Sequence, residues 1–590
     1  MDWLKALYQK FPWLMISTGI VLSIAFLVSL IVVGTENKPV QEVVQTVKVS
    51  SKVEKPVEEL IQPEEEIERK SIPKNVESEL VSYEEDTFIL PDDAPDPNQD
   101  LHLDLGDPEG VDNLPTGATG GTSAGVGTGG HLGSGVSAFA SRRVGSGGKG
   151  RRPLGVTQAT EASVLEGLRW LIRHQNPDGS WAANSLNEMC TQGSPCWPPT
   201  LDGNGKEIAR TSHYDEGLTA LSLLAFLGAG HGHDSRVKIV DTQMAKAYTI
   251  GDVVKKGLQW LRDRQNEDGS FSKERFMYNE VLAAMAMTEA YGLTQARAWK
   301  EPAQKAIDFL VAAQKKNPNG SGLWGWRYHA RSLIEERKER GEIDDAEYAQ
   351  LIYDADTSVT TWAVMAFKSA EMSGLKVPEE AMDGAMSFIR FVTPRGKGGD
   401  SSAAGNQTGA PRDTGSYNGK VGYLDAARAG EKVTGPRDMF TYYPEAMSSL
   451  GMCSRIFINH DHSDPFLRPA AELIAKKPPT AKDKLNIDYY YWYYGTLALN
   501  QYDGPDSPNK GRGGYWDKWN KAMNDAILEL QDKTETKDIC NKGGWLTLDR
   551  WSYSGGPIYT TAINVLSLEV YYRFENAFGS GTPKKGAKPK

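Results

Sequence analysis

Four stretches of this chain repeat one plan: an apolar helical run, a Gln, a Gly-containing turn and a closing aromatic residue. The Gln side chain can hydrogen-bond backbone groups left free at a helix end, Gly permits a tight turn, and the aromatic ring packs on the next helix. Self-similarity of this kind indicates a repeat architecture in which neighbouring units bury one another. The copies are LEGLRWLIRHQNPDGSW (165–181), VKKGLQWLRDRQNEDGSF (254–271), AQKAIDFLVAAQKKNPNGSGLWGW (303–326) and DAILELQDKTETKDICNKGGW (525–545).

A second set of helical runs alternates with the first. These runs are rich in Ala, Leu and Met, which is typical of helices that are buried on most sides. They are predicted at 212–229, 276–291, 356–373, 440–458, 487–501 and 558–576.

Each of these runs follows another predicted helix and forms a pair with it. The pairs give six helical hairpins, or about twelve helices. An inner ring of six helices inside an outer ring of six is an all-α fold, the α/α toroid. A straight solenoid is the alternative, but six pairs without a polar capping repeat favour closure. Residues 393–437 are predicted as a long Gly-rich loop. The first helices are predicted near 160–175, 251–265, 302–314, 378–392, 466–476 and 516–531.

The copies QNPDGSW (175–181) and QNEDGSF (265–271) resemble the QxxxGxW motif of squalene-hopene cyclases and the related protein prenyltransferase β subunits. The resemblance covers about residues 156–578 and implies the terpenoid-cyclase toroid. The closing stretches DYYYWYYGTLALNQY (488–502) and GGPIYTTAINVLSLEVYYRF (555–574) look like uncharacterised membrane-anchored squalene-cyclase-like proteins of planctomycete-type bacteria. For such a family the implied activity is terpene cyclisation.

The stretch YDADTSVTTWAVMAF (353–367) tests that activity. The family protonates an alkene with a DxDDTA motif, whose middle Asp is the acid. When the motif is aligned on its Asp-Thr-small end, Ala355 stands at the position of this acid. In the other register Asp356 takes that position, but Thr357 replaces the third Asp. The motif is incomplete, and the proton donor is absent in the preferred register. Asp356 then has three candidate roles: capping the helix, binding a ligand, or, together with Asp354, catalysis.

The first turns of the inner helices gather around one mouth of a toroid. Each of these turns contains Tyr and three contain Asp, which predicts a polar, aromatic basin able to hold a sugar, a peptide or a polar headgroup. A cyclase cavity would need mainly apolar aromatic residues. The candidate ligand-binding residues are His213, Tyr214, Asp215, Asp354, Asp356, Tyr442, Tyr443, Asp488, Tyr490, Trp492 and Tyr559.

Three hypotheses follow for function. The leading one is a non-catalytic binding or scaffold module that has lost its acid. The second is an isoprenoid cyclase that uses Asp356. The third is a carbohydrate-active toroid enzyme, with Asp215 or Glu216 facing Asp354 or Asp356 across about 5–10 Å.

The chain contains four cysteines, and no cofactor or metal is expected from them. Cys190 and Cys196 are a possible disulfide in an oxidising compartment. No paired CxxC pattern is present, and Cys540 has no obvious partner ligands. A prenyltransferase-type zinc site would also require a His where Thr560 and Thr561 stand.

The N-terminal sequence predicts where the protein lies relative to a membrane. LMISTGIVLSIAFLVSLIVV (14–33) is long enough to cross a bilayer, and Lys5 and Lys10 before it predict a cytoplasmic N-terminus and a periplasmic toroid. The Pro/Glu-rich part of the linker, 35–115, is a candidate contact for another envelope protein, and a net charge of −11 argues against nucleic acid. The predicted regions are a transmembrane anchor (1–34), a disordered linker (35–152), the toroid (153–578) and a disordered basic tail (579–590).

Overall fold

The computed structural model describes the chain between residues 156 and 573. The chain divides into two units, Met1–Asp96 and Pro97–Lys590, and every described residue lies in the second. The predicted anchor, linker and tail therefore lie outside the described residues. Within the described part, no helix combines the length and apolar character needed to span a bilayer. The segments left out of the description are 191–194, 199, 202–206, 209–211, 242–245, 321, 396–415, 432–442, 483 and 535–538.

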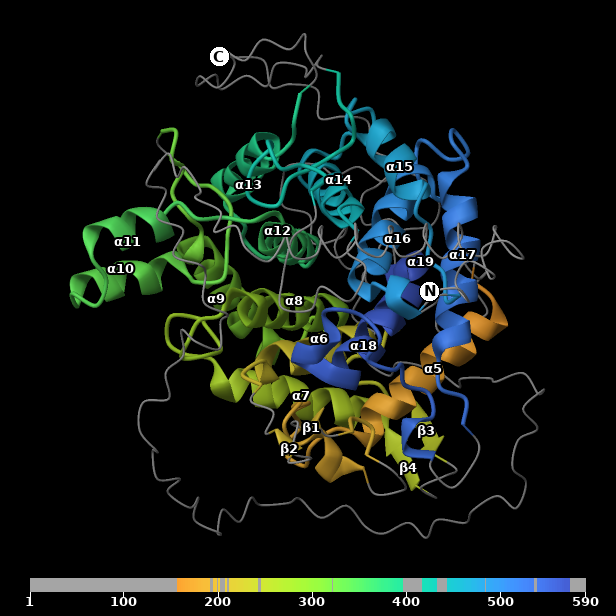
Figure 1. Ribbon diagram of the computed structural model, residues 1–590. Coiled ribbons are helices and arrows are strands. Elements are labelled where there is room, and N and C mark those ends of the chain that lie inside the picture. Colours follow the sequence, from red (N-terminus) through yellow and green to blue (C-terminus); the bar gives the residue numbers. More distant parts are fainter. Residues whose placement is uncertain are drawn as a thin grey trace, which may run out of the picture. The chain divides into compact units, whose positions relative to one another are not determined.

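Six helices form a closed inner ring (Figure 1). Helix α6 packs on α8, α8 on α12, α12 on α14, α14 on α16, α16 on α18, and α18 returns to α6. This cycle confirms the predicted α/α toroid over a straight solenoid. The inner helices are α6 (Asp215–Gly228), α8 (Met277–Thr294), α12 (Thr357–Met372), α14 (Glu445–Asn459), α16 (Tyr489–Asp503) and α18 (Ser552–Leu568).

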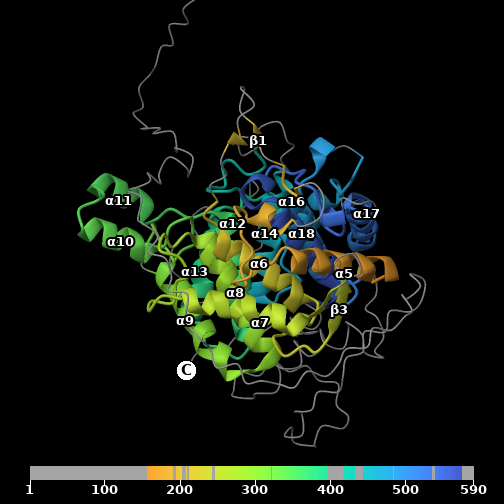
Figure 2. The same cartoon turned by 90° about the horizontal axis from the view of Figure 1, so that it is seen from below.

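Six further helices surround this ring, each against one or two inner helices (Figure 2). The first of them, α5, packs on α18 and also touches α6 and α17, so the first hairpin meets the last. We call this contact between the two ends of the ring the seam. The outer helices are α5 (Gln158–Arg173), α7 (Ile250–Arg264), α9 (Arg297–Ala313), α13 (Glu379–Phe391), α15 (Leu467–Ala475) and α17 (Tyr515–Leu530).

The two rings differ in burial as their sequences predict. Every residue of α8 from Asn279 to Leu293 is buried, because this helix has neighbours on all sides. In α7 the buried residues recur every three or four positions, as in Val254, Leu258 and Leu261, and the remaining positions face solvent. An apolar stripe of this width is what a helix packed on one side requires.

The Gln of each repeat ties its own turn to the next outer helix. Each Gln Nε2 donates to one carbonyl in its turn and to a second carbonyl near the start of the next outer helix, at 2.6–3.2 Å. The pairs of acceptors are Gly179 and Val253 for Gln175, Gly269 and Pro302 for Gln265, Trp324 and Ala381 for Gln314, and Gly543 and Ser163 for Gln531. Since Ser163 belongs to α5, the fourth copy closes the ring.

The turn glycines are required for two reasons. Gly179, Gly269 and Gly543 all have a positive φ, between 88° and 98°. A Cβ atom at any of them would also lie only 2.2–2.5 Å from a backbone oxygen of the neighbouring outer helix. Glycine alone permits both the turn and this close approach.

Several smaller elements connect the helices of the two rings. Helices α10 (Arg331–Glu339) and α11 (Asp345–Leu351) form an unpredicted hairpin with a small core of its own, Ile334, Ile343 and Ile352. Strands β3 (Lys238–Asp241) and β4 (Lys246–Thr249) pair antiparallel, with Lys238 opposite Thr249. The remaining elements are β1 (Thr200–Leu201), β2 (Glu207–Ile208), α19 (Val570–Arg573) and the 3₁₀ turns η1 (Leu186–Met189), η2 (Lys484–Asn486) and η3 (Ile539–Asn541).

Candidate functional site

The first turns of the inner helices contact one another at one mouth of the ring. Asn279 at the start of α8 donates to the His213 carbonyl before α6, at 3.0 Å. The Tyr278 hydroxyl lies 2.7 Å from Ser358 Oγ in the first turn of α12. The Tyr443 hydroxyl, just before α14, donates to the Asn486 carbonyl before α16, at 3.1 Å.

Further contacts join α16, α18 and α6 at the same mouth. Tyr559 in α18 donates to Asp549 Oδ2 at 3.4 Å, and the backbone N–H of Tyr489, at the start of α16, donates to the same carboxylate at 3.2 Å. Ser212 Oγ before α6 donates to the Ser554 carbonyl of α18 at 3.3 Å. All six inner helices thus contribute to one mouth, as the sequence predicts.

Side chains also meet across the ring. Helices α12 and α16 are separated by α14 in the ring, yet Ser358 of α12 is hydrogen-bonded to the Tyr490 hydroxyl of α16. One level deeper, the Trp362 ring lies 5.9 Å from that of Tyr493 and 5.4 Å from that of Tyr494, centroid to centroid. These side chains therefore bridge two inner helices that are not neighbours in the ring.

Asp356 lies within this packing and is fully buried. Its Oδ1 accepts the N–H of Val359 at 2.8 Å, so it caps α12. Its Oδ2 lies 3.9 Å from Arg327 Nε. Burial raises the pKa of Asp356 to about 7, against the lowering effects of Arg327 and the hydrogen bonds it accepts. Of the three roles considered for Asp356, the capping role is the one these contacts display.

Asp354 is held by an ion pair. Arg327 Nη1 lies 2.7 Å and 2.9 Å from its two carboxylate oxygens. The same guanidinium lies 5.1 Å from the Tyr328 ring centroid and 6.0 Å from that of Tyr423, and these two tyrosine hydroxyls are 2.7 Å apart. The charge of Asp354 is thus already paired within the protein.

A second pair of carboxylates lies at the start of α16. Asp488 is fully buried and caps this helix, with Oδ1 accepting the N–H of Tyr491 at 2.9 Å. Burial, and then the nearby Asp549, raise the pKa of Asp488 to about 7. Burial raises the pKa of Asp549 to about 6, opposed by hydrogen bonds that include those from Ser552. Sequence reasoning missed Asp549, although an Asp three residues before a Ser at a helix start is a capping signal.

The other predicted residues are dispersed around the mouth. His213 is exposed, and half-buried Tyr214 packs 5.3 Å from Phe276. Burial raises the pKa of half-exposed Asp215 to about 6. Tyr443 stacks on Tyr491 with ring centroids 4.9 Å apart.

Two predicted residues fall elsewhere. Trp492 is 1% exposed and packs edge-on against Tyr489, so it is part of the core and not of the basin. The reason is that a helix whose first turn is YYYWYY cannot present every aromatic ring to one side. Tyr442 lies outside the described residues.

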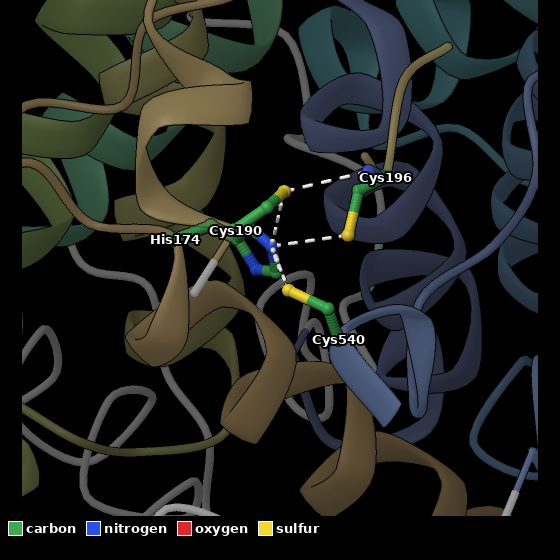
Figure 3. Close-up of side chains that lie close together, drawn as sticks. All are labelled: His174, Cys190, Cys196 and Cys540. Atoms are coloured by element: carbon green, nitrogen blue, oxygen red, sulfur yellow. Dashed lines mark hydrogen bonds between the residues drawn. The ribbon is translucent and has the colours of Figure 1, made fainter. Parts of the chain in front are cut away.

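Sequence reasoning also missed a cluster of four potential metal ligands at the seam (Figure 3). His174 Nε2 lies 3.2 Å from Cys196 Sγ, 3.4 Å from Cys540 Sγ and 3.7 Å from Cys190 Sγ. The predicted disulfide is absent: Cys190 and Cys196 are both free thiols. Their sulfur atoms face the imidazole and Cys540, partners that lie far from them in the sequence. Hydrogen bonding to Cys196 and Cys540 holds the pKa of the Cys190 thiol well below its usual range.

Comparison with known proteins supports the predicted resemblance. No family model matches the chain. A squalene–hopene cyclase from Bradyrhizobium diazoefficiens is 26% identical over 211 residues, which cover 30% of this chain and 31% of that enzyme. Over the matched residues the chain is therefore similar to a squalene–hopene cyclase. The match spans about a third of the length of this curated relative.

The likeness of this chain to solved structures is weaker. The type II terpene cyclase MstE from Scytonema has 13% identity and a TM-score of 0.39, covering 71% of this chain and 98% of its own. The GH76A α-1,6-mannanase of Salegentibacter sp. HEL1_6 has 11% identity and a TM-score of 0.39, covering 70% and 99%. At these values the likenesses add no weight to an assignment of activity.

Proposed function

We propose that this protein is a membrane-anchored, extracytoplasmic binding or scaffold module, whose mouth holds a polar ligand without transforming it. The observation that carries this proposal is the cross-ring contact between α12 and α16. Ser358 and Tyr490, and below them Trp362 with Tyr493 and Tyr494, occupy space that a cyclase must leave open for a polyprenyl chain.

The chemistry of the acid supports the same conclusion. Protonating an alkene requires a strong acid, and an Asp whose pKa is raised to about 7 is a weak one. Ala355, at the position of the acid in the preferred register, is buried, and its Cβ would lie only 3.0 Å from a Cβ added to Gly325. Asp356 is engaged as a helix cap instead.

The surface of the mouth suits a ligand that forms hydrogen bonds. Its tyrosines pair a flat apolar face with a hydroxyl group, a combination that stacks on sugars and grips peptide groups or polar headgroups. Carboxylates at the start of α6 add hydrogen-bond acceptors. The half-buried tyrosines near the mouth are Tyr214, Tyr278, Tyr328, Tyr423, Tyr443 and Tyr559.

A carbohydrate-active enzyme is the competing hypothesis, because raised pKa values such as those of Asp488 and Asp549 suit a general acid. Each of these two carboxylates, however, accepts backbone N–H groups of the α16 or α18 starts. They are engaged in holding the helix ends in place, which favours the binding module.

The experiment incubates the full chain in detergent with squalene, polyprenyl lipids and envelope glycans, followed by mass spectrometry of the products. The proposal expects no cyclised, transferred or hydrolysed product from the wild type or from Asp356→Asn. A cyclised product that disappears in Asp356→Asn would establish the isoprenoid cyclase. Oligosaccharide release that disappears in Asp215→Asn or Asp488→Asn would establish the carbohydrate-active enzyme.

A further inference from the structure

The His174, Cys190, Cys196 and Cys540 side chains converge with the dimensions of a metal site. Their ligand atoms all lie within 4.8 Å of one another. In a tetrahedral zinc site, bond lengths of about 2.3 Å to sulfur and about 2.0–2.1 Å to nitrogen place N and S about 3.6 Å apart. The three distances from His174 Nε2 to sulfur are 3.2, 3.4 and 3.7 Å. The distances from nitrogen to sulfur are therefore close to those of a zinc site.

The imidazole is oriented for coordination. His174 Nδ1 lies 2.7 Å from the Trp170 carbonyl, which fixes the proton on Nδ1 and directs the lone pair of Nε2 to the sulfurs. The ring is stacked on Trp170, with centroids 4.0 Å apart. A hydrogen bond from the second ring nitrogen to a backbone carbonyl is the usual support of a metal-binding histidine.

Hydrogen bonds and an ion pair also hold the cysteines in place. Cys190 Sγ accepts the backbone N–H of Cys196 at 3.4 Å, an interaction that favours a thiolate. Arg173 donates to the Lys542 carbonyl and pairs with Asp241 at 2.9 Å, which holds η3, and with it Cys540, against the end of α5. The ligand set is thus supported from both sides of the seam.

We infer that these three cysteines and His174 bind one Zn²⁺ ion that staples the first hairpin of the ring to the last. His174 ends α5, and Cys540 lies in η3 between α17 and α18. These two ligands are 366 residues apart in sequence, so one ion closes nearly the whole ring.

The role of this ion is structural. Four protein ligands complete a tetrahedron and leave no open position for substrate. His174, Cys196 and Cys540 are buried, at 1%, 4% and 5% exposure. On binding, each cysteine that still carries a proton releases it, and the ion joins three thiolates and a neutral imidazole, with no change of oxidation state.

The test measures metal content of the full chain, purified without a polyhistidine tag or chelator. The wild type should contain about one zinc per chain, and Cys540→Ser should contain at least tenfold less. Cys453 supplies a matched control, because it is a fully buried cysteine of α14 outside the cluster. Cys453→Ser should retain the wild-type zinc content.

A second measurement needs no variant, in case Cys540→Ser does not fold. Cobalt exchanged into the wild type should show thiolate-to-cobalt charge transfer and the intense visible bands of a tetrahedral site. Wild-type protein without bound metal, a Cys190–Cys196 disulfide detected by mass spectrometry, or zinc retained by a folded Cys540→Ser would overturn the inference.

Discussion

Asp356, which the sequence offers as a candidate acid, serves the fold instead. It caps α12 and is buried beside Arg327. Its burial makes the charged form unfavourable, so its pKa is raised from an ordinary 3.8 to about 7. In the folded protein the carboxyl therefore binds a proton more tightly than in the unfolded chain.

This shift gives a signed prediction for Asp356→Asn. Stabilisation by the protonated carboxyl is fully present below about pH 4, declines as the pH rises towards about 7, and is constant above. At about 1.4 kcal/mol per pKa unit, the wild type should lose roughly 4 kcal/mol relative to the variant between these limits. Urea unfolding of both proteins in detergent at several pH values measures the difference. Equal pH dependence in the two proteins would mean that folding does not raise the pKa of Asp356.

The sequence pattern could not predict that the proposed metal ligands lie close together. Cys190 and Cys196 are close in the chain, and their spacing suggests a disulfide, whereas Cys540 is 366 residues from His174. His174 directly precedes the Gln of the first repeat, and its position there carries no metal signature. Only ring closure makes these residues neighbours.

The repeats, in contrast, predict helices and their connections well. Each Gln bonds backbone carbonyls, as expected, although the acceptors lie in its own turn and in the next outer helix. All twelve predicted helices are found. The hairpin α10–α11 was missed because its helices are highly charged and bury only a few isoleucines. The capping and packing roles of the mouth residues depend on contacts between hairpins, which local periodicity does not encode.

Gln531 allows the closing repeat to be tested directly. Its side chain donates to Ser163 and Gly543 and accepts from Ser163 Oγ at 2.7 Å. Gln531→Ala removes these three buried hydrogen bonds, each with a net contribution of about 0.5–1.5 kcal/mol, so we expect a loss of roughly 2–4 kcal/mol of unfolding free energy. Urea unfolding measures this loss.

The matched control is Gln304→Ala, because the hydrogen bonds of the Gln304 side chain, to Asp308 and to the backbone of Lys376, are all exposed. This change should cost less than about 0.5 kcal/mol. If both variants lose equally little, the Gln of the fourth repeat does not hold the ring closed.

For the whole molecule, the ring joins its first and last hairpins through helix contacts, a Gln and a cluster of metal-ligand side chains. In the proposed function, a tether connects this closed ring to a membrane. The 20-residue apolar segment 14–33 is the proposed anchor of this ring in the cytoplasmic membrane.

Deletion of residues 1–34 tests this location. We expect the full chain in the membrane fraction and the shortened chain in the supernatant after centrifugation of lysed cells. Protease added to cells with a permeabilised outer membrane should digest the full-length toroid, since the proposed orientation is periplasmic. A full-length chain in the supernatant, or one protected from the protease, would contradict the anchor or its orientation.

The central claim is that the mouth binds its ligand and does not transform it. The most direct test is native mass spectrometry of the full chain extracted from its own membranes. The account predicts that wild type and Asp356→Asn retain the same glycan, peptide or headgroup at an unchanged mass, and that Tyr214→Ala at the mouth retains less. A cyclised or prenyl-transferred product on the wild type, missing from Asp356→Asn, would contradict it.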